Sequence, residues 1–96
     1  MRLLNEAERA GLLQGLPGWR DMPGQRAIGA EFRFKDFKAA WAFMAQVAAL
    51  ADTQDHHPEW SNTFNRVSIV LTTHDAGGVT ERDARLARSI AALAPA

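Results

Sequence analysis

Residues 26–34 alternate between apolar and other side chains, and this two-residue period constrains the fold more than any other feature of the chain. In an extended chain, successive side chains point to opposite faces. One face would therefore be wholly apolar, with Ile28, Ala30, Phe32 and Phe34, and the other would carry Gly29, Glu31 and Arg33. The pattern predicts a strand with one face on a hydrophobic core.

The segment before this strand predicts a helix and a second, shorter strand. Asn5 and Glu8 have the spacing of a capping box, which predicts a helix over residues 6–14 that stops at a glycine. Residues 19–22 are predicted to form a short strand. The Pro23-Gly24 pair that follows is typical of a turn, so the two strands are expected to pair.

The second half of the chain repeats this order without repeating the sequence. Residues 60–64 and 67–73 are predicted as strands joined by a tight hairpin at Asn65-Arg66. Thr80 and Asp83 again have the spacing of a capping box. The final helix that they begin has an apolar stripe of Leu86, Ile90 and Leu93.

Asp36 is a predicted N-cap for a helix between the two strand pairs, and this helix has two apolar rows. One row consists of Phe37, Trp41, Met44 and Ala48, and the other of Ala40, Phe43, Val47 and Leu50. Together they are wider than the contact with one sheet face usually requires. We favour burial in the core for Trp41 and Met44. The other row is left open between the core and a contact with another subunit.

The predicted order is therefore helix, two strands, helix, two strands, helix. Strand pairs joined by hairpins, with helices between them, favour a four-stranded antiparallel sheet. We predict an α+β two-layer sandwich with all three helices on one face of the sheet. A chain of 96 residues is expected to form one domain over residues 1–96, with a small core that oligomerisation would supplement.

Composition excludes several classes of function. Eleven basic residues balance eleven acidic ones, so the chain lacks the positive field that nucleic-acid binding usually requires. The chain has no cysteine, which excludes disulfides and thiolate ligands. No apolar run approaches the ~20 residues of a membrane helix. Its first residues turn polar too soon for a signal peptide, so we expect a cytoplasmic protein that binds no membrane.

All three histidines lie near residues that suit acid/base chemistry. His56 and His57 stand in the run Asp-His-His-Pro-Glu-Trp at residues 55–60, and His74 follows a predicted strand. Histidine is the side chain that exchanges protons most readily near neutral pH. Pro58 favours an extended backbone at His57, so the two adjacent rings should point to opposite sides and have different roles.

Other side chains in this region have both a functional and a structural interpretation. Trp60 offers a flat face for a ring to stack on, although a tryptophan is more often part of a core. Asp52, Asp55 and Asp83 could orient an imidazole, and Asp83 could do so while it caps a helix. Glu59 is expected to be solvated. A metal site is not expected, because adjacent histidines on one element are a poor ligand pair and no HExxH pattern is present.

Together these residues resemble the pterin-4a-carbinolamine dehydratase family, from about Gly18 to Leu93. The most specific parts are the run at residues 55–60, Thr73-His74, and Glu-Arg-Asp at residues 81–83. The segments 32–37 and 43–44 are also similar to the family.

The resemblance implies an activity and a site. The family removes water from a 4a-hydroxytetrahydropterin, the product left by aromatic amino-acid hydroxylases, and forms the quinonoid dihydropterin without a metal or organic cofactor. By this resemblance the catalytic residues are His56, His57 and His74, and further positions around the pterin are Asp55, Trp60, Thr73 and Asp83.

Within this site we expect His56 and His74 to be the acid/base pair and His57 mainly to hold the pterin. Loss of water needs a proton delivered to the leaving hydroxyl and one removed from the adjacent nitrogen. Where many relatives have a glutamate shortly before the histidines, this chain has Asp52, whose carboxylate reaches about one methylene less.

The resemblance also implies a homodimer or homotetramer. A runner-up function belongs to another class, because some animal relatives bind the dimerisation helices of a homeodomain transcription factor as coactivators. The wide apolar surface of residues 37–50 is of the kind that such binding uses. A pterin-binding protein without turnover is a third interpretation, disfavoured by the complete set of histidines.

Overall fold

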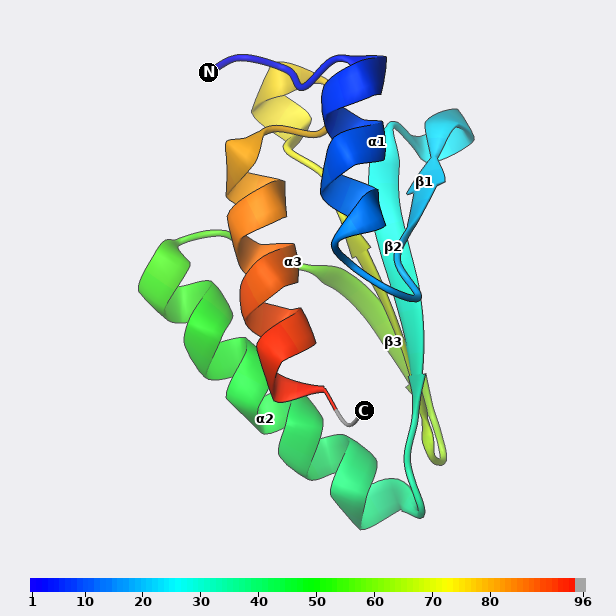
Figure 1. The fold of residues 1–96 in the computed structure, drawn as a ribbon. Helices are drawn as coiled ribbons and strands as arrows, with labels where there is room; N and C mark the ends of the chain where they lie inside the picture. Colours follow the sequence, from blue (N-terminus) through cyan, green and yellow to red (C-terminus); the bar gives the residue numbers. More distant parts are fainter. Residues whose placement is uncertain (95–96) are drawn as a thin grey trace.

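The computed structural model describes residues 1–94 and contains the predicted elements in the predicted order (Figure 1). In chain order these are α1 (Glu6–Gln14), β1 (Arg20–Met22), the 3-10 turn η1 (Pro23–Gln25), β2 (Ala27–Arg33), α2 (Phe37–Gln54), β3 (Glu59–Thr63), β4 (Arg66–Leu71), the 3-10 turn η2 (His74–Ala76) and α3 (Glu81–Leu93). None of the helices in this described part is long and apolar enough to cross a membrane.

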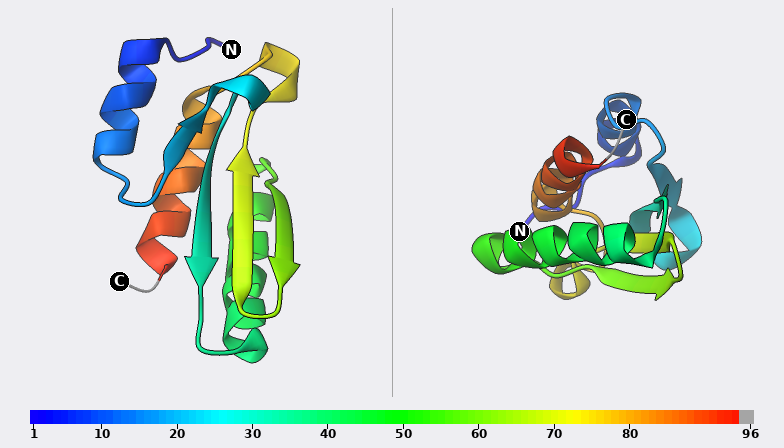
Figure 2. Two further views of the ribbon diagram at one scale, coloured as in Figure 1. Left: turned by 90° about the vertical axis from the view of Figure 1, so that its right-hand side faces the viewer. Right: turned by 90° about the horizontal axis from the view of Figure 1, so that it is seen from below.

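The four strands form one antiparallel sheet in the order β1-β2-β4-β3. The two predicted hairpins, β1-β2 and β3-β4, meet through the central pair β2-β4, where Ile28 lies opposite Leu71 and Ala30 opposite Ile69. The three helices lie on one side of the sheet, and α2 and α3 run behind the strands in the left view of Figure 2. The predicted two-layer α+β fold is confirmed.

The core lies between the sheet and the helices. The sheet contributes Ile28, Ile69 and Leu71, each at most 1% exposed. Across from them, α3 contributes Leu86 and Ile90, which are fully buried. Each such side chain stabilises the fold by roughly 1.5–3 kcal/mol relative to an exposed position. The alternation of β2 and the stripe of α3 therefore face one another, although Leu93, predicted in that stripe, is 36% exposed.

The orientation of α2 differs from our prediction. Trp41 is 59% exposed and Phe37 is 50% exposed, so the row that we expected in the core faces outward, with Met44 half-buried at its edge. The other row faces the sheet, with Ala40, Phe43 and Val47 buried and Leu50 half-buried. The expectation of a buried Trp41 is wrong for the single chain, because both rows have helical spacing and only the packing selects one.

All three predicted helix caps are present. The side chain of Asn5 accepts the backbone N–H of Glu8, that of Asp36 accepts the N–H of Ala39, and the Thr80–Asp83 capping box closes in both directions. The β3-β4 turn lies one residue earlier than predicted. It consists of residues 64–65, and Phe64 takes the left-handed conformation at φ 49°, which is uncommon for a bulky side chain.

Glu8 gives the N-terminal segment a charge-dependent stability. Arg2 donates two hydrogen bonds to its carboxylate, at 2.7 and 2.9 Å, and the backbone N–H of Asn5 donates a third at 2.9 Å. The hydrogen bond from Arg2, followed by that from Asn5, lowers the pKa of Glu8 from 4.5 to about 2. A lowered pKa in the folded state stabilises the fold above pH 4.5, and this stabilisation is lost as the pH falls through about 2.

We therefore expect Glu8→Gln to unfold at lower urea concentration than the wild type at neutral pH. The difference should shrink between pH 4.5 and about 2, where wild-type Glu8 becomes protonated. Urea titrations across this pH range measure it. Glu6→Gln removes the same charge from the same helical turn but leaves the Arg2 pair intact, so a similar pH profile for this control would contradict the assignment to Arg2.

Candidate active site

The end of α2 places the two adjacent histidines in different environments. Asp55 ends the helix in the left-handed conformation at φ 50°, which aspartate tolerates better than most residues. The backbone N–H of His56 then donates to the carbonyl of Ala51 at 3.0 Å, which closes the helix end. The side chain of His56 is 10% exposed and that of His57 is 60% exposed. The two adjacent rings therefore differ in exposure, although both line one hollow.

His56 is paired with a buried carboxylate at the start of α3. Its Nε2 lies 2.5 Å from Oδ1 of Asp83, a residue that is fully buried. The other oxygen of Asp83, Oδ2, accepts the backbone N–H of Thr80 and the hydroxyl of Thr73, each at 2.8 Å. Asp83 is thus both a member of the capping box of α3 and the partner of a histidine 27 residues away. Full pairing is what makes a buried carboxylate tolerable.

The other two histidines have carboxylate partners at the surface. Nε2 of His57 lies 3.0 Å from Asp52, and Nε2 of His74 lies 2.7 Å from Glu59. The side chains of both histidines are more than half exposed, so these pairs contribute little to stability. All three rings therefore engage a carboxylate through the same nitrogen, Nε2.

The three histidines border one open hollow of about 360 Å³ on the protein surface, called here the histidine hollow. This volume is within the ~300–1,000 Å³ usual for small-molecule sites. Its lining residues are Asp55, His56, His57, Thr72, Thr73, His74, Asp75 and Arg82. The structure thus brings together the three histidines, Asp55 and Thr73 as predicted.

Two predicted site residues do not line this hollow. Trp60 is partly buried on β3 and packs against the core, which is its structural interpretation. Asp83 lies behind His56 rather than beside the open space.

Sequence reasoning missed several contributors. Glu59 is exposed, as expected, but it also pairs with His74, since the start of β3 lies beside the end of β4, where Glu59 is opposite Val70. Arg82 and Asp75 give the lining charges of both signs. Only their closeness in sequence to Asp83 and His74 could have suggested them.

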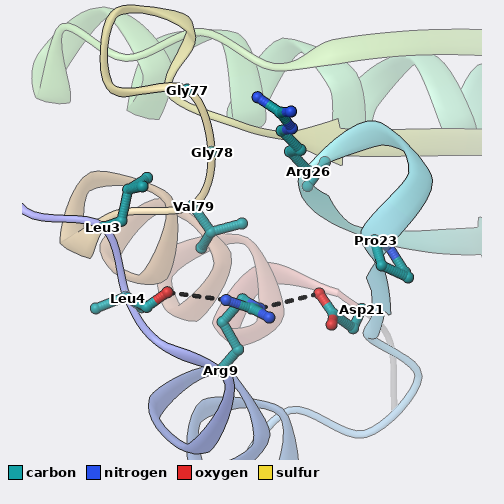
Figure 3. Close-up of a pocket in the computed structure, with 10 residues that line it drawn as sticks. Leu3, Leu4, Arg9, Asp21, Pro23, Arg26, Gly77, Gly78 and Val79 are labelled. Carbon is teal, nitrogen blue, oxygen red and sulfur yellow. Dashed lines mark hydrogen bonds and ion pairs between the residues drawn. The ribbon is translucent and has the colours of Figure 1, made fainter.

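A second cavity lies around residues 77–79, and it shares no lining residue with the histidine hollow (Figure 3). Its walls anchor the chain between His74 and α3. The backbone N–H of Leu4 donates to the carbonyl of Val79 at 2.8 Å. Arg9 in turn donates to the carbonyl of Leu4 at 2.8 Å and pairs with Asp21 at 3.3 Å. The N-terminal segment therefore supports the loop that carries His74 from behind.

Residues 1–94 contain no group of three or more histidine, cysteine or acidic side chains that is arranged to hold a metal ion. The histidine hollow can support proton exchange, because three imidazoles border a space open to a small molecule.

Comparison with known proteins gives one consistent result. The sequence profile of the family described as pterin 4 alpha carbinolamine dehydratase matches residues 2–93. A relative from Rhizorhabdus wittichii, whose name places it among the pterin-4-alpha-carbinolamine dehydratases, is 55% identical over 95% of this chain and 94% of its own length. A relative from Rhodopseudomonas palustris with the same name is 51% identical over 98% of this chain and 93% of its own.

A solved structure has the same fold. The crystal structure of a transcriptional coactivator/pterin dehydratase from Brucella melitensis superposes with a TM-score of 0.94 and 47% identity. The match covers 98% of this chain and all of that one.

Proposed function

Because the chain belongs to the pterin-4a-carbinolamine dehydratase family and is a dehydratase acting on a pterin, we propose that His56, His57 and His74 bind the substrate and move its protons. The observation that carries this proposal is the single hollow bordered by all three imidazoles. Each ring is oriented through Nε2 by its own carboxylate.

The reaction needs one acid and one base. The bond between carbon 4a and its hydroxyl oxygen breaks, and the oxygen leaves as water after it receives a proton. The adjacent ring nitrogen loses a proton, and the electrons of that N–H bond form the carbon–nitrogen double bond of the quinonoid product. One proton is delivered and one is removed, so the pair of imidazoles gains no net proton. The base ends protonated and the acid ends neutral, and proton exchange with water resets both rings before the next turnover.

We assign these two roles to His56 and His74, and substrate binding to His57. The ring of His56 is held by a fully buried partner, which suits a group that must meet one reacting atom. Asp55 and Arg82 border the same hollow and can hydrogen-bond the polar edge of the pterin. Asp52 reaches His57 at 3.0 Å, so the shorter carboxylate still orients that ring.

The test is turnover of freshly generated 4a-hydroxytetrahydropterin, followed by ultraviolet absorbance. The wild type should accelerate dehydration well above the spontaneous rate. His57→Ala should raise KM more than it lowers kcat, because a group that only binds contributes equally to the ground and transition states. A folded wild type that gives no acceleration would sink the proposal and leave a binding or coactivator role.

We also propose that the substrate is supplied in the cytoplasm by an aromatic amino-acid hydroxylase. The support is chemical, because the 4a-hydroxyl is what such a hydroxylase leaves on the pterin. Adding the protein to a coupled hydroxylase assay should speed the return of the tetrahydropterin.

The outward row of α2 supports self-association, which we propose as the state in solution. Phe37 and Trp41 are both at least half exposed on the same helix face. Large apolar side chains grouped on a surface mark contact sites. A second copy of the chain would cover them, and it would add the apolar burial that a domain of 96 residues lacks. A coactivator partner would use the same face.

We expect Trp41→Lys to reduce the assembly towards a 10.6 kDa species while the fold survives, since Trp41 lies outside the core. Light scattering at micromolar concentration measures this. Gln46→Lys places the same charge on an exposed position on another side of α2 and should leave the assembly intact. If the wild type itself runs as the 10.6 kDa species, the face is free for another partner and self-association is wrong.

A further inference from the structure

We infer that Thr73 and Thr80 are positioning residues that act through Asp83 on His56, and that they leave Nδ1 of His56 as the nitrogen that exchanges a proton with the substrate. The contacts run from the start of α3 to the histidine hollow without a gap. This inference rests on the proposed role of His56.

The hydrogen bonds can run in only one direction. A carboxylate accepts but does not donate, so the single hydroxyl proton of Thr73 goes to Oδ2 of Asp83. The contact of 2.8 Å between the hydroxyls of Thr73 and Thr80 must then use the proton of Thr80. The hydroxyl oxygen of Thr80 in turn accepts the backbone N–H of Arg82 at 3.2 Å. The first donor in this series of hydrogen bonds is therefore a backbone N–H, which can donate but cannot accept.

This direction determines the tautomer of His56. Two donors, the hydroxyl of Thr73 and the backbone N–H of Thr80, hold Oδ2 of Asp83. Oδ1 remains to accept from His56, so Nε2 must carry the proton. In the neutral ring Nδ1 is then without a proton and can act as the base. After it accepts a proton from the substrate, the same atom must release that proton to water before the next turnover.

The network also reassigns Thr73. Its hydroxyl donates to Asp83 and accepts from Thr80, which leaves it little capacity for a pterin, although the residue borders the hollow. A substrate ligand and a positioning residue respond differently to mutation. Loss of a substrate contact raises KM, whereas loss of positioning lowers kcat.

The first test is Thr73→Val, which keeps the shape of the side chain and removes the hydroxyl. We expect kcat to fall about 10-fold and KM to stay unchanged, because a loss of this size is usual when a group that orients a functional histidine is removed. Thr73→Ser restores the hydroxyl and should recover kcat. A raised KM with unchanged kcat would show that Thr73 binds the substrate and would overturn the inference.

Thr80→Val tests the next link and needs a control, because Thr80 is also the N-cap of α3. Asp36→Ala removes the N-cap of α2, at the opposite end of that helix from His56. Both variants should lose stability, but only Thr80→Val should lose kcat, and Thr80→Ser should recover it. Equal losses of kcat in Thr80→Val and Asp36→Ala would assign the effect to stability and contradict positioning.

A spectroscopic readout separates this inference from the proposed function. Long-range proton–nitrogen NMR spectra report which ring nitrogen of each of the three histidines carries the proton. At alkaline pH, where the imidazoles are neutral, His56 should show only the Nε2–H form in the wild type. In Thr73→Val it should show a mixture of the two forms. An unchanged tautomer in Thr73→Val would refute the positioning role even if His56 proves essential. If the tautomer changes in Thr73→Val but replacement of His56 leaves turnover unchanged, the catalytic role of His56 is refuted instead.

Discussion

His56→Gln is expected to fold and to lower kcat by about 10²–10⁴-fold, the contribution typical of a positioned acid or base. The glutamine side-chain amide can occupy the place of Nε2 and donate to Asp83, but it cannot exchange a proton with the substrate. Comparison of His56→Gln with the wild type therefore separates the loss of proton transfer from any loss of stability. Steady-state kinetics on freshly generated substrate, with thermal unfolding of both proteins, measures the two effects separately.

Replacement of His56 by alanine is a less informative test of catalysis. His56→Ala would leave Oδ1 of the buried Asp83 carboxylate without its hydrogen-bond donor, at a cost of roughly 1–3 kcal/mol or more. Small domains have only about 5–15 kcal/mol in total, so loss of activity could reflect unfolding.

The same histidine-to-glutamine substitution at positions 57 and 74 tests the division between proton transfer and substrate binding. His74→Gln should also lower kcat, whereas His57→Gln should mainly raise KM. Equal changes in both parameters at all three positions would contradict the division.

Asp83→Asn is expected to reduce kcat on a similar scale, about 10²-fold or more. The amide oxygen must occupy the Oδ2 position, because the backbone N–H of Thr80 can only donate. The amide NH₂ then takes the Oδ1 position and points a donor at Nε2 of His56. This reverses the tautomer, so that Nδ1 of His56 becomes a donor and can no longer accept the proton of the substrate.

Asp52→Asn is the matched control for this substitution. It makes the same chemical change in the carboxylate partner of His57, but both side chains are largely exposed and water can replace the lost contact. Its effect on kcat should be small. If Asp83→Asn is no more harmful than Asp52→Asn, the buried pair is structural only. Ring-nitrogen NMR on Asp83→Asn should show His56 in the Nδ1–H form.

Local physical chemistry explains why much of the fold is predictable from the sequence. The three N-caps need only a side chain and a backbone N–H two or three residues away, so Asn5, Asp36 and Thr80 act as their spacing predicts. The alternation of residues 26–34 likewise depends only on the geometry of an extended chain. The family resemblance supplied the activity and the set of histidines, and the comparisons agree with the activity.

Features that depend on how elements pack were not predictable in this way. Trp41 and Phe43 belong to rows that both have helical spacing, and the rotation of α2 about its own axis against the sheet decides which row is buried. Glu59 meets His74 only because β3 pairs with β4 in one particular register. The charge of Glu59 by itself predicts only solvation.

By itself, the sequence determined the elements, their order, the helix starts and the candidate histidines, because each depends on residues close together in the chain. The tertiary structure decided which carboxylate serves each histidine, and that choice separates one buried pair from two exposed ones. His56 and Asp83 are 27 residues apart, and no local rule joins them. They meet because the end of α2 and the start of α3 pack together beside the end of the sheet, where burial strengthens the hydrogen bonds of a fully paired carboxylate.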